Sequence, residues 1–437
     1  MARRFVLLLL ALCLSAGLRA SPQPLPDPLT LDYALAQVGT GHPEVERARA
    51  AVERANAVRR AGTAADDWTV SLNTRARWIG PSELAFDRDH DDHKVSLNAD
   101  TLLYDFGRGS AREAAASAEV QQFQWELVDR VSEQRLRVMQ RFFDALIADL
   151  EFVARNEAMT MTFLRFDRLR ERSAFGQVSD IELLEAEAAY ERFLAERTAA
   201  EQRQRLAREA LAQTMHRPGE LSANLAEPEL VDWDRDLPAY EQLLETATAS
   251  NPRLLSLRER LSASAQALSS ARASVRPTLH AGAEVAAYSR DESGNDEWRL
   301  GVNLNVPLYT GERGEASIAE ALAGRRLARA ELYRFEAQLR HALLAVWQRI
   351  TLLRLRRRET LVNEDYRDLY LDRSRALYER SVRSDLGDAM AEFSAARVET
   401  ARVAYSHTLA WERLHALLGT HNEVIRQVVS RDPGGGD

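Results

Sequence analysis

One short polar stretch carries side chains that could bind a metal ion. The run Asp87-Arg88-Asp89-His90-Asp91-Asp92-His93 combines four carboxylates with two imidazoles, and side chains of these types hold divalent cations in proteins. The run lies in a loop between two predicted strands, and the segment 289–297 is a second acidic loop. We interpret both as solvated loops and predict no metal site. The alternative is that the two loops bind divalent cations or repel anionic neighbours.

The chain carries no other recognisable arrangement of chemically active residues. Its sequence contains no HExxH, GxSxG, P-loop or GxGxxG motif, each of which brings metal ligands, a nucleophile or phosphate-binding amides together. Five further histidines are scattered singly: His216, His280, His341, His407 and His415. We therefore predict a protein that is not an enzyme and has no cofactor.

The amino-acid composition excludes further classes of protein. The 437 residues include 58 Lys and Arg against 66 Asp and Glu, which gives a formal net charge of −8. A mildly acidic chain without a basic stripe is not expected to bind nucleic acid. The only cysteine is Cys13, which excludes a disulfide scaffold and a cysteine-based zinc site. A hydrophobic fraction of 45% indicates a folded protein, and the length favours two units.

The first twenty residues read as a secretory signal peptide. Arg3 and Arg4 precede an apolar run over 5–14, and small residues lead to a plausible cleavage site after Ala20. We therefore expect export. A lipid anchor on Cys13 is disfavoured, because Leu12 stands where a small residue is required. Beyond Ala20, no window of about 18 apolar residues predicts a transmembrane helix.

The rest of the chain repeats one pattern. Pro43 and Pro252, 209 residues apart, each open a helical segment after a capping residue, and Ser179 and Ser384, 205 apart, each interrupt a long helical segment. We predict repeat 1 over 21–230, repeat 2 over 231–420 and a flexible tail over 421–437. The predicted helices are 43–64, 110–174 and 180–213 in repeat 1, and 252–274, 315–378 and 385–418 in repeat 2.

Four strands are predicted from strict alternation of apolar and polar residues, at about 68–78, 95–103, 279–288 and 298–308. Their length and alternation fit membrane-spanning strands, and Trp68, Trp78 and Trp298 stand at strand ends where an aromatic girdle would lie. Four strands cannot close a barrel, and lipid does not tolerate open edges. Either the sheet is a soluble one, or several copies share one barrel.

The helices are too long for a compact domain. The segment 110–174 lacks proline and internal glycine, and some 65 helical residues span roughly 100 Å. Leu339, Leu343, Val346, Ile350 and Leu353 are spaced four and three residues apart, which is the spacing of a coiled-coil seam. We therefore expect each long helix to pack along other helices.

Several weak motifs, taken in their order and spacing, resemble one family. They are Leu29-Thr30-Leu31-Asp32-Tyr33-Ala34-Leu35, the two helix openings at His42-Pro43 and Asn251-Pro252, Arg276-Pro277-Thr278-Leu279, Pro307-Leu308-Tyr309-Thr310-Gly311, and the helix break that runs from Gly176 to Ala186. Together they resemble the TolC-like outer-membrane efflux proteins over nearly the whole mature chain.

The resemblance implies a mainly helical fold with a small membrane β part. It implies a homotrimer with a 12-stranded β-barrel in outer-membrane lipid, continued by a long periplasmic α-barrel. Such a protein is the passive, gated exit duct of a tripartite efflux pump or a type I secretion system. Its partners are a periplasmic membrane-fusion adaptor and an inner-membrane transporter. The sequence does not distinguish drugs, metal ions, small molecules or polypeptides as cargo.

The resemblance also assigns residues at the two helix breaks. Adaptor docking falls on the turns Gly176, Gln177, Val178, Ser179, Asp180 and Ser381, Val382, Arg383, Ser384. Arg383, Asp385 and Asp388 are the candidates for the periplasmic gate. The second turn departs from the family pattern, because Ser381 replaces the usual glycine and Gly387 stands where an acid is common. Plain capping, with Ser179 and Glu182 as a capping box, and solvated helix ends are the simpler interpretations.

One alternative belongs to another functional class. A periplasmic coiled-coil adaptor or scaffold with a small soluble sheet would also combine long helices with few strands. It would carry one central helical hairpin, and not a repeated helix–strand–strand–helix unit.

Overall fold

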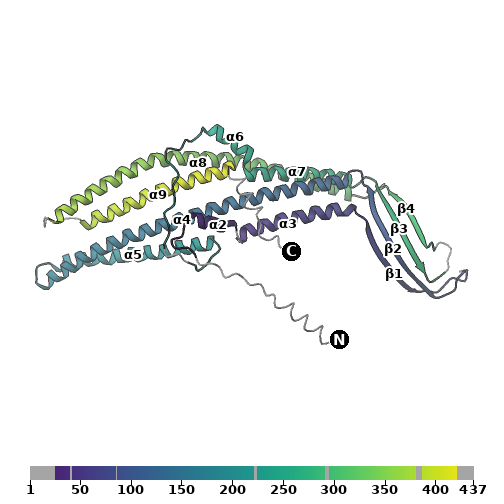
Figure 1. The fold of residues 1–437 in the computed structure, drawn as a ribbon, viewed down its shortest axis with the longest axis horizontal. Helices are drawn as coiled ribbons and strands as arrows, with labels where there is room; N and C mark the ends of the chain where they lie inside the picture. The colour runs from purple at the N-terminus through teal and green to yellow at the C-terminus, as the bar shows by residue number, and fades with distance from the viewer. Residues whose placement is uncertain are drawn as a thin grey trace, which may run out of the picture.

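The computed structural model describes residues 25–39, 42–84, 86–220, 224–290, 295–379 and 386–420. The predicted signal peptide, the second helix break at 381–385 and the predicted tail lie outside these ranges. The molecule is elongated, with one β-sheet at one end and pairs of long helices extending to the other (Figure 1). None of the helices in the described ranges combines the length and apolarity needed to cross a bilayer.

Four antiparallel strands form one sheet in the order β1-β2-β3-β4. They are β1 at Thr69–Trp78, β2 at Asp91–Tyr104, β3 at Thr278–Tyr288 and β4 at Trp298–Asn305. The sheet thus joins two hairpins that are far apart in sequence, through the pairing of β2 with β3. Strand β4 is shorter than the predicted 298–308, as expected where Pro307 has no N–H to donate to a neighbouring strand.

The metal-like stretch is not entirely a loop, which corrects the sequence interpretation. Strand β2 starts at Asp91, because Asp91 pairs with Trp78 and His93 pairs with Ala76 of β1. Neighbouring side chains of a strand point to opposite faces, so Asp91 and Asp92 are turned away from each other. Backbone pairing across the hairpin, which the local polarity of the sequence does not reveal, extends this strand.

Six helices carry most of the chain. They are α3 (Pro43–Thr63), α4 (Arg108–Ala174), α5 (Asp180–Thr214), α7 (Pro252–Ala273), α8 (Arg313–Glu379) and α9 (Leu386–Leu418). Helices α3 and α7 begin as the sequence indicated: proline occupies the first turn, and the side chains of His42 and Asn251 accept a backbone N–H. The short helices α2 (Leu31–Ala36) and α6 (Tyr240–Ser250) were not predicted.

Helix α4 is the central element of the helical part. It packs against α3 and α7 on the side of the sheet and against α5 and α9 further away, while α8 packs against α7 and α9. The predicted seam on α8 is buried at Leu339, Leu343, Ile350 and Leu353. The seam packs with Trp411 and Leu414 of α9 in one hydrophobic cluster.

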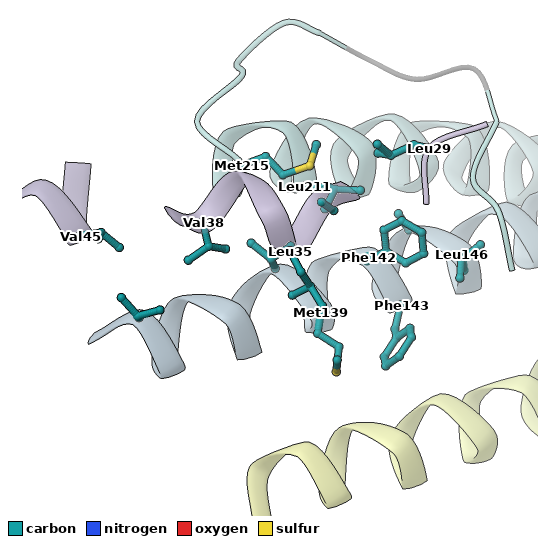
Figure 2. Close-up of a cluster of buried hydrophobic side chains, with 14 of the residues drawn as sticks. Leu29, Leu35, Val38, Val45, Met139, Phe142, Phe143, Leu146, Leu211 and Met215 are labelled. Atoms are coloured by element: carbon teal, nitrogen blue, oxygen red, sulfur yellow. The ribbon is translucent and has the colours of Figure 1, made fainter. Parts of the chain in front are cut away.

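A second hydrophobic cluster lies where α2, α4 and α5 meet (Figure 2). Phe142 of α4 is fully buried, and Leu29, Val38 and Leu211 belong to the same cluster. Phe143 stacks on Tyr405 of α9, with ring centroids 4.9 Å apart. The motif Leu29–Leu35 therefore has a packing role, because it fills this cluster from outside the long helices.

Asp105 organises the junction between the sheet and α4. Its carboxylate accepts the backbone N–H groups of Gly107 at 3.1 Å, Arg108 at 3.1 Å and Gly109 at 2.5 Å. These donors belong to the start of α4, whose N–H groups have no partner within the helix. Gly107 has a φ of 91°, a left-handed conformation that glycine adopts without steric cost. The strand therefore passes directly into a capped helix.

The segment 231–238, which precedes α6, is attached to the long helices by aromatic rings. His407 of α9 is fully buried, stacks on Trp233 with centroids 4.0 Å apart, and accepts the indole N–H of Trp411 at 3.1 Å. Trp347 of α8 donates its indole N–H to the carbonyl of Pro238 at 3.1 Å. The segment 231–238 is therefore held against the middle of α8 and α9.

This attachment predicts a loss of stability in acid. Burial, followed by the charges of Arg354 and Arg357 on α8, lowers the pKa of His407 to about 4, although Asp232 opposes the shift. The unfolded chain binds this proton near pH 6.5 and the folded chain only near pH 4, so the stabilisation is complete above 6.5 and is lost as pH falls toward 4. The cost at pH 4.5 is about 2–3 kcal/mol.

Because His407 titrates in this range, we expect acidification from pH 7 to pH 4.5 to change the melting temperature of the detergent-solubilised wild-type protein more unfavourably than that of a variant without this histidine. In His407→Leu, which removes the titrating group, the melting temperature at pH 4.5 relative to that at pH 7 should be clearly higher than in the wild type. His280→Leu, which removes a histidine from the sheet and leaves His407 in place, serves as the control. Equal acid sensitivity in all three proteins would rule out His407 as the cause.

Candidate functional site

One face of the sheet is apolar across all four strands. The register aligns Leu72 with Leu97, Leu97 with Val285, and Val285 with Trp298, so these side chains form one row on the same face. The row on the helix side of it contains Val70, Ala99, Ala283 and Leu300. Leu72, Trp298 and Leu300 are 68%, 71% and 76% exposed. Such a broad apolar surface without a cover indicates contact with lipid or with another protein.

The opposite face of the sheet is polar and carries paired charges. Arg77 forms an ion pair with Asp92, and Lys94 forms one with Glu284, which also contacts Arg299 at 3.3 Å. Ser71, Asn73, Asn98 and Asn303 add neutral polar groups on the same face. The sheet thus has one apolar and one polar face. This matches membrane β-strands, whose side chains alternate between an apolar and a polar face.

Both edges of the sheet are open in the described part of the chain. Strand β1 pairs only with β2, and β4 pairs only with β3. Strand edges present unpaired N–H and C=O groups that can pair with another chain. Both edges could therefore pair with further strands.

The turn between α4 and α5 caps the C-terminus of α4 and the N-terminus of α5. Gly176 has a φ of 68°, its N–H donates to Ser173 O at 2.8 Å, and the Gln177 N–H donates to Arg172 O at 3.0 Å. The side chains of Ser179 and Glu182 form the capping box predicted from the sequence. Gly176, Gln177, Ser179 and Asp180 are exposed, and Val178 is half-buried.

Several solved structures share this architecture. The outer membrane protein VceC of Vibrio cholerae matches with a TM-score of 0.73 and 20% identity, over 89% of this chain and 96% of that one. The Campylobacter jejuni CmeC outer membrane channel matches with a TM-score of 0.74 and 15% identity, over 92% and 90%. This chain has the TolC-like fold. The resemblance predicted from the sequence motifs is thus confirmed at the level of fold.

A third solved structure with the TolC-like fold is a channel in its open state. The open state of the Neisseria gonorrhoeae MtrE outer membrane channel matches with a TM-score of 0.71 and 16% identity, over 89% of this chain and 88% of that one. No family model and no curated protein sequence matches this chain. Its place among the TolC-like structures therefore rests on the arrangement of its elements.

Part of the predicted site lies outside the described residues. Ser381, Val382, Arg383, Ser384 and Asp385 fall in 380–385, so the second turn and two of the three gate candidates are not described. The third gate candidate, Asp388, is exposed in the first turn of α9. The candidate gate therefore stays a prediction.

The start of α9 is tied to α4 and α8 by contacts that the sequence did not reveal. Ser394 donates a hydrogen bond to Glu157 of α4 at 2.5 Å, and Arg367 of α8 pairs with Glu392. A Cβ on Gly387 would lie only 3.1 Å from the Cβ of Met161, so α9 approaches α4 closely there. These contacts link α9 and its neighbours near the turns.

The metal-like stretch does not form a ligand cluster. His90 stacks on Trp78 with centroids 5.5 Å apart, Asp92 is paired with Arg77, and Asp91 accepts a hydrogen bond from Ser289 Oγ at 2.8 Å through its carbonyl. Among the residues that the structure describes, no group of three or more His, Cys, Asp or Glu is arranged to hold a metal ion. The stretch instead joins the outer ends of the two hairpins.

Proposed function

We propose that this protein is an outer-membrane channel that works as the exit duct of a tripartite efflux pump or a type I secretion system. One observation carries the proposal: the only described sheet has an uncovered apolar face and two open edges at one end of a long helical body. Three copies would supply twelve strands and close a barrel with its apolar face toward outer-membrane lipid. The fold shared with outer membrane channels supports this assignment.

In the proposed trimer, the polar face of the sheet lines a wet lumen and the helices continue the tube into the periplasm. Each protomer would contribute one hairpin from repeat 1 (21–230) and one from repeat 2 (231–420). Residues 1–20 would direct export. The two helix turns would dock a periplasmic adaptor, and an inner-membrane transporter would supply the energy. Transport through the duct would be passive and gated near the turns, with Arg383, Asp385 and Asp388 as the candidate gate.

The capped turn between α4 and α5 allows a test of its stability. Ser179→Ala removes one half of the capping box and should destabilise the start of α5 by about 1 kcal/mol. Hydrogen exchange at the first amides of α5 should then be several-fold faster, while Gln177→Ala, which keeps the capping box, should leave it unchanged. Unaltered exchange in Ser179→Ala would mean that the turn does not depend on this cap.

The alternative, a periplasmic adaptor or scaffold with a soluble sheet, is not favoured. In a soluble protein, the row of Leu72, Leu97 and Val285 would lie in water, because nothing in the described protomer covers it. The match to outer membrane channels also extends over about nine tenths of the chain.

Fractionation and reconstitution test the proposal. The protein should sediment with outer membranes, require detergent for extraction, run as a trimer after cross-linking and form conducting pores in planar bilayers. Recovery as a monomer from the soluble periplasmic fraction would overturn it. A trimer in the outer membrane that forms no pores, alone or with its adaptor, would exclude a duct.

A further inference from the structure

Helix α8 carries a line of exposed apolar and aromatic side chains along one side. The line consists of Tyr333, Leu344, Leu355 and Tyr366, which follow one another at intervals of 11 residues and are 62%, 37%, 69% and 55% exposed. Eleven residues make close to three helical turns, so the four side chains share one side of α8 over about 50 Å. Val362, which is 63% exposed, lies on the same side. We name these five residues the α8 stripe.

The α8 stripe is turned away from the rest of the helical body. Leu353 is buried in the hydrophobic cluster that α8 shares with α9, and Leu355 follows it by two residues. Two residues turn an α-helix by about 200°, so Leu355 points to the side opposite α9. Figure 1 shows α8 at one margin of the body and α5 at the other, with α9 and α4 between them. A margin helix with an exposed apolar outer side indicates a further contact.

Helix α5, at the other margin, carries a line of mostly small exposed residues. Ala195, Ala199 and Leu206 are exposed, whereas Ala186 and Ala200 are buried where α5 packs on α4. The intervals within the exposed line are four and seven residues. The same intervals separate three members of the α8 stripe, Tyr366, Val362 and Leu355. Helices α5 and α8 run in opposite directions, so the two lines can be set side by side in register.

Three side-chain contacts fix the height of the two lines along the body. Taken from α5 through α4 and α9 to α8, they are the pair Glu196–Arg155, the hydrogen bond Ser394–Glu157 and the pair Glu392–Arg367. Successive contacts are only two residues apart on the helix that they share. Glu196 and Arg367 are therefore level to within about one helical turn, or 5 Å. Each directly adjoins its own exposed line, so the two lines have equal height.

We infer that α8 of one copy packs antiparallel along α5 of the next copy. Large side chains of the α8 stripe would then lie against small ones of α5: Tyr366 against Ala195, and Val362 against Ala199. The inference rests on the proposed barrel and deepens it. Strand β4 leads into α8, and β1 follows α3, which lies on α4 at the same margin as α5. Pairing of β4 with β1 of the next copy therefore brings these two margins together, at equal height because the copies are related by rotation.

Paired cysteines in the full-length protein test this interface, because the only natural cysteine, Cys13, lies in the predicted signal peptide. A disulfide requires Cα atoms within about 7 Å of each other. On oxidation of the detergent-solubilised protein, Ala199→Cys/Val362→Cys should therefore run as linked dimers and trimers. The matched control is Ala188→Cys/Val362→Cys, because Ala188 is also exposed on α5 but lies 11 residues, or about 16 Å, along the helix. It should give about ten-fold less linked product.

The outcomes separate the two proposals. Pore-forming trimers in which Ala199→Cys/Val362→Cys links no better than the control would overturn the α8–α5 interface alone. Equally strong linking of both pairs would also overturn it, because the links would then reflect random collisions. A soluble monomer that forms no pores would overturn the channel function and this inference with it. Leu206→Cys/Leu355→Cys probes the same interface at a second height and should link as well, so it decides the question if the first pair lowers the melting temperature.

Discussion

Replacing Leu97 by arginine should abolish insertion of the protein into the outer membrane. Leu97 lies at the middle of β2, half exposed on the apolar face, between Leu72 and Val285. A charged residue on the lipid face of a membrane β-strand costs about 2–4 kcal/mol near the bilayer centre. Three copies would bring three such charges into one barrel. Outer-membrane fractionation measures the effect.

The adjacent residue supplies a matched control. Asn98 is the next residue of the same strand, and its side chain is on the polar face opposite Glu284. Asn98→Arg introduces the same side chain one position along and should insert at nearly the wild-type level. If Leu97→Arg inserts as well as Asn98→Arg does, the apolar face does not contact lipid and the barrel proposal fails.

The second large effect concerns the helical core. Phe142 is fully buried in the cluster in Figure 2, so Phe142→Ala leaves a cavity inside this cluster. Truncation of a buried phenylalanine to alanine costs about 3–5 kcal/mol. The melting temperature of the solubilised protein should drop sharply.

Phe175 offers the same substitution without burial. It is 79% exposed in the turn after α4, and Phe175→Ala should change stability by no more than about 0.5 kcal/mol. Equal melting temperatures for Phe142→Ala and Phe175→Ala would show that the cluster does not stabilise the fold.

Local patterns in the sequence were sufficient to predict the long elements. The alternation of Val70, Leu72 and Thr74 with polar residues matches β1, and proline after a capping residue places the starts of α3 and α7. The capping box of Ser179 and Glu182 was likewise readable, because all of its partners are within three residues. Signals of this kind depend on neighbours in sequence alone.

Features that depend on distant partners were not predictable. Asp91 belongs to β2 only because Trp78 pairs with it, and the exposure of Leu355 is evident only once α9 is placed on the opposite side of α8. His407 looked like one of several scattered histidines, yet the ring of Trp233, 174 positions earlier, stacks on it. The sequence carries no local signal for such contacts. The candidate gate was carried over from the family resemblance and stays a prediction.

The two open edges of the sheet have a consequence for how such a protein is made. On the proposed assembly, a newly exported copy cannot enter the bilayer by itself, since its unpaired strand edges would meet hydrocarbon. Insertion and oligomerisation would then be a single event, and its rate would rise steeply with the local concentration of the protein. Before insertion, the hydrophobic surface around Leu97 would need to be covered by a periplasmic chaperone to prevent aggregation.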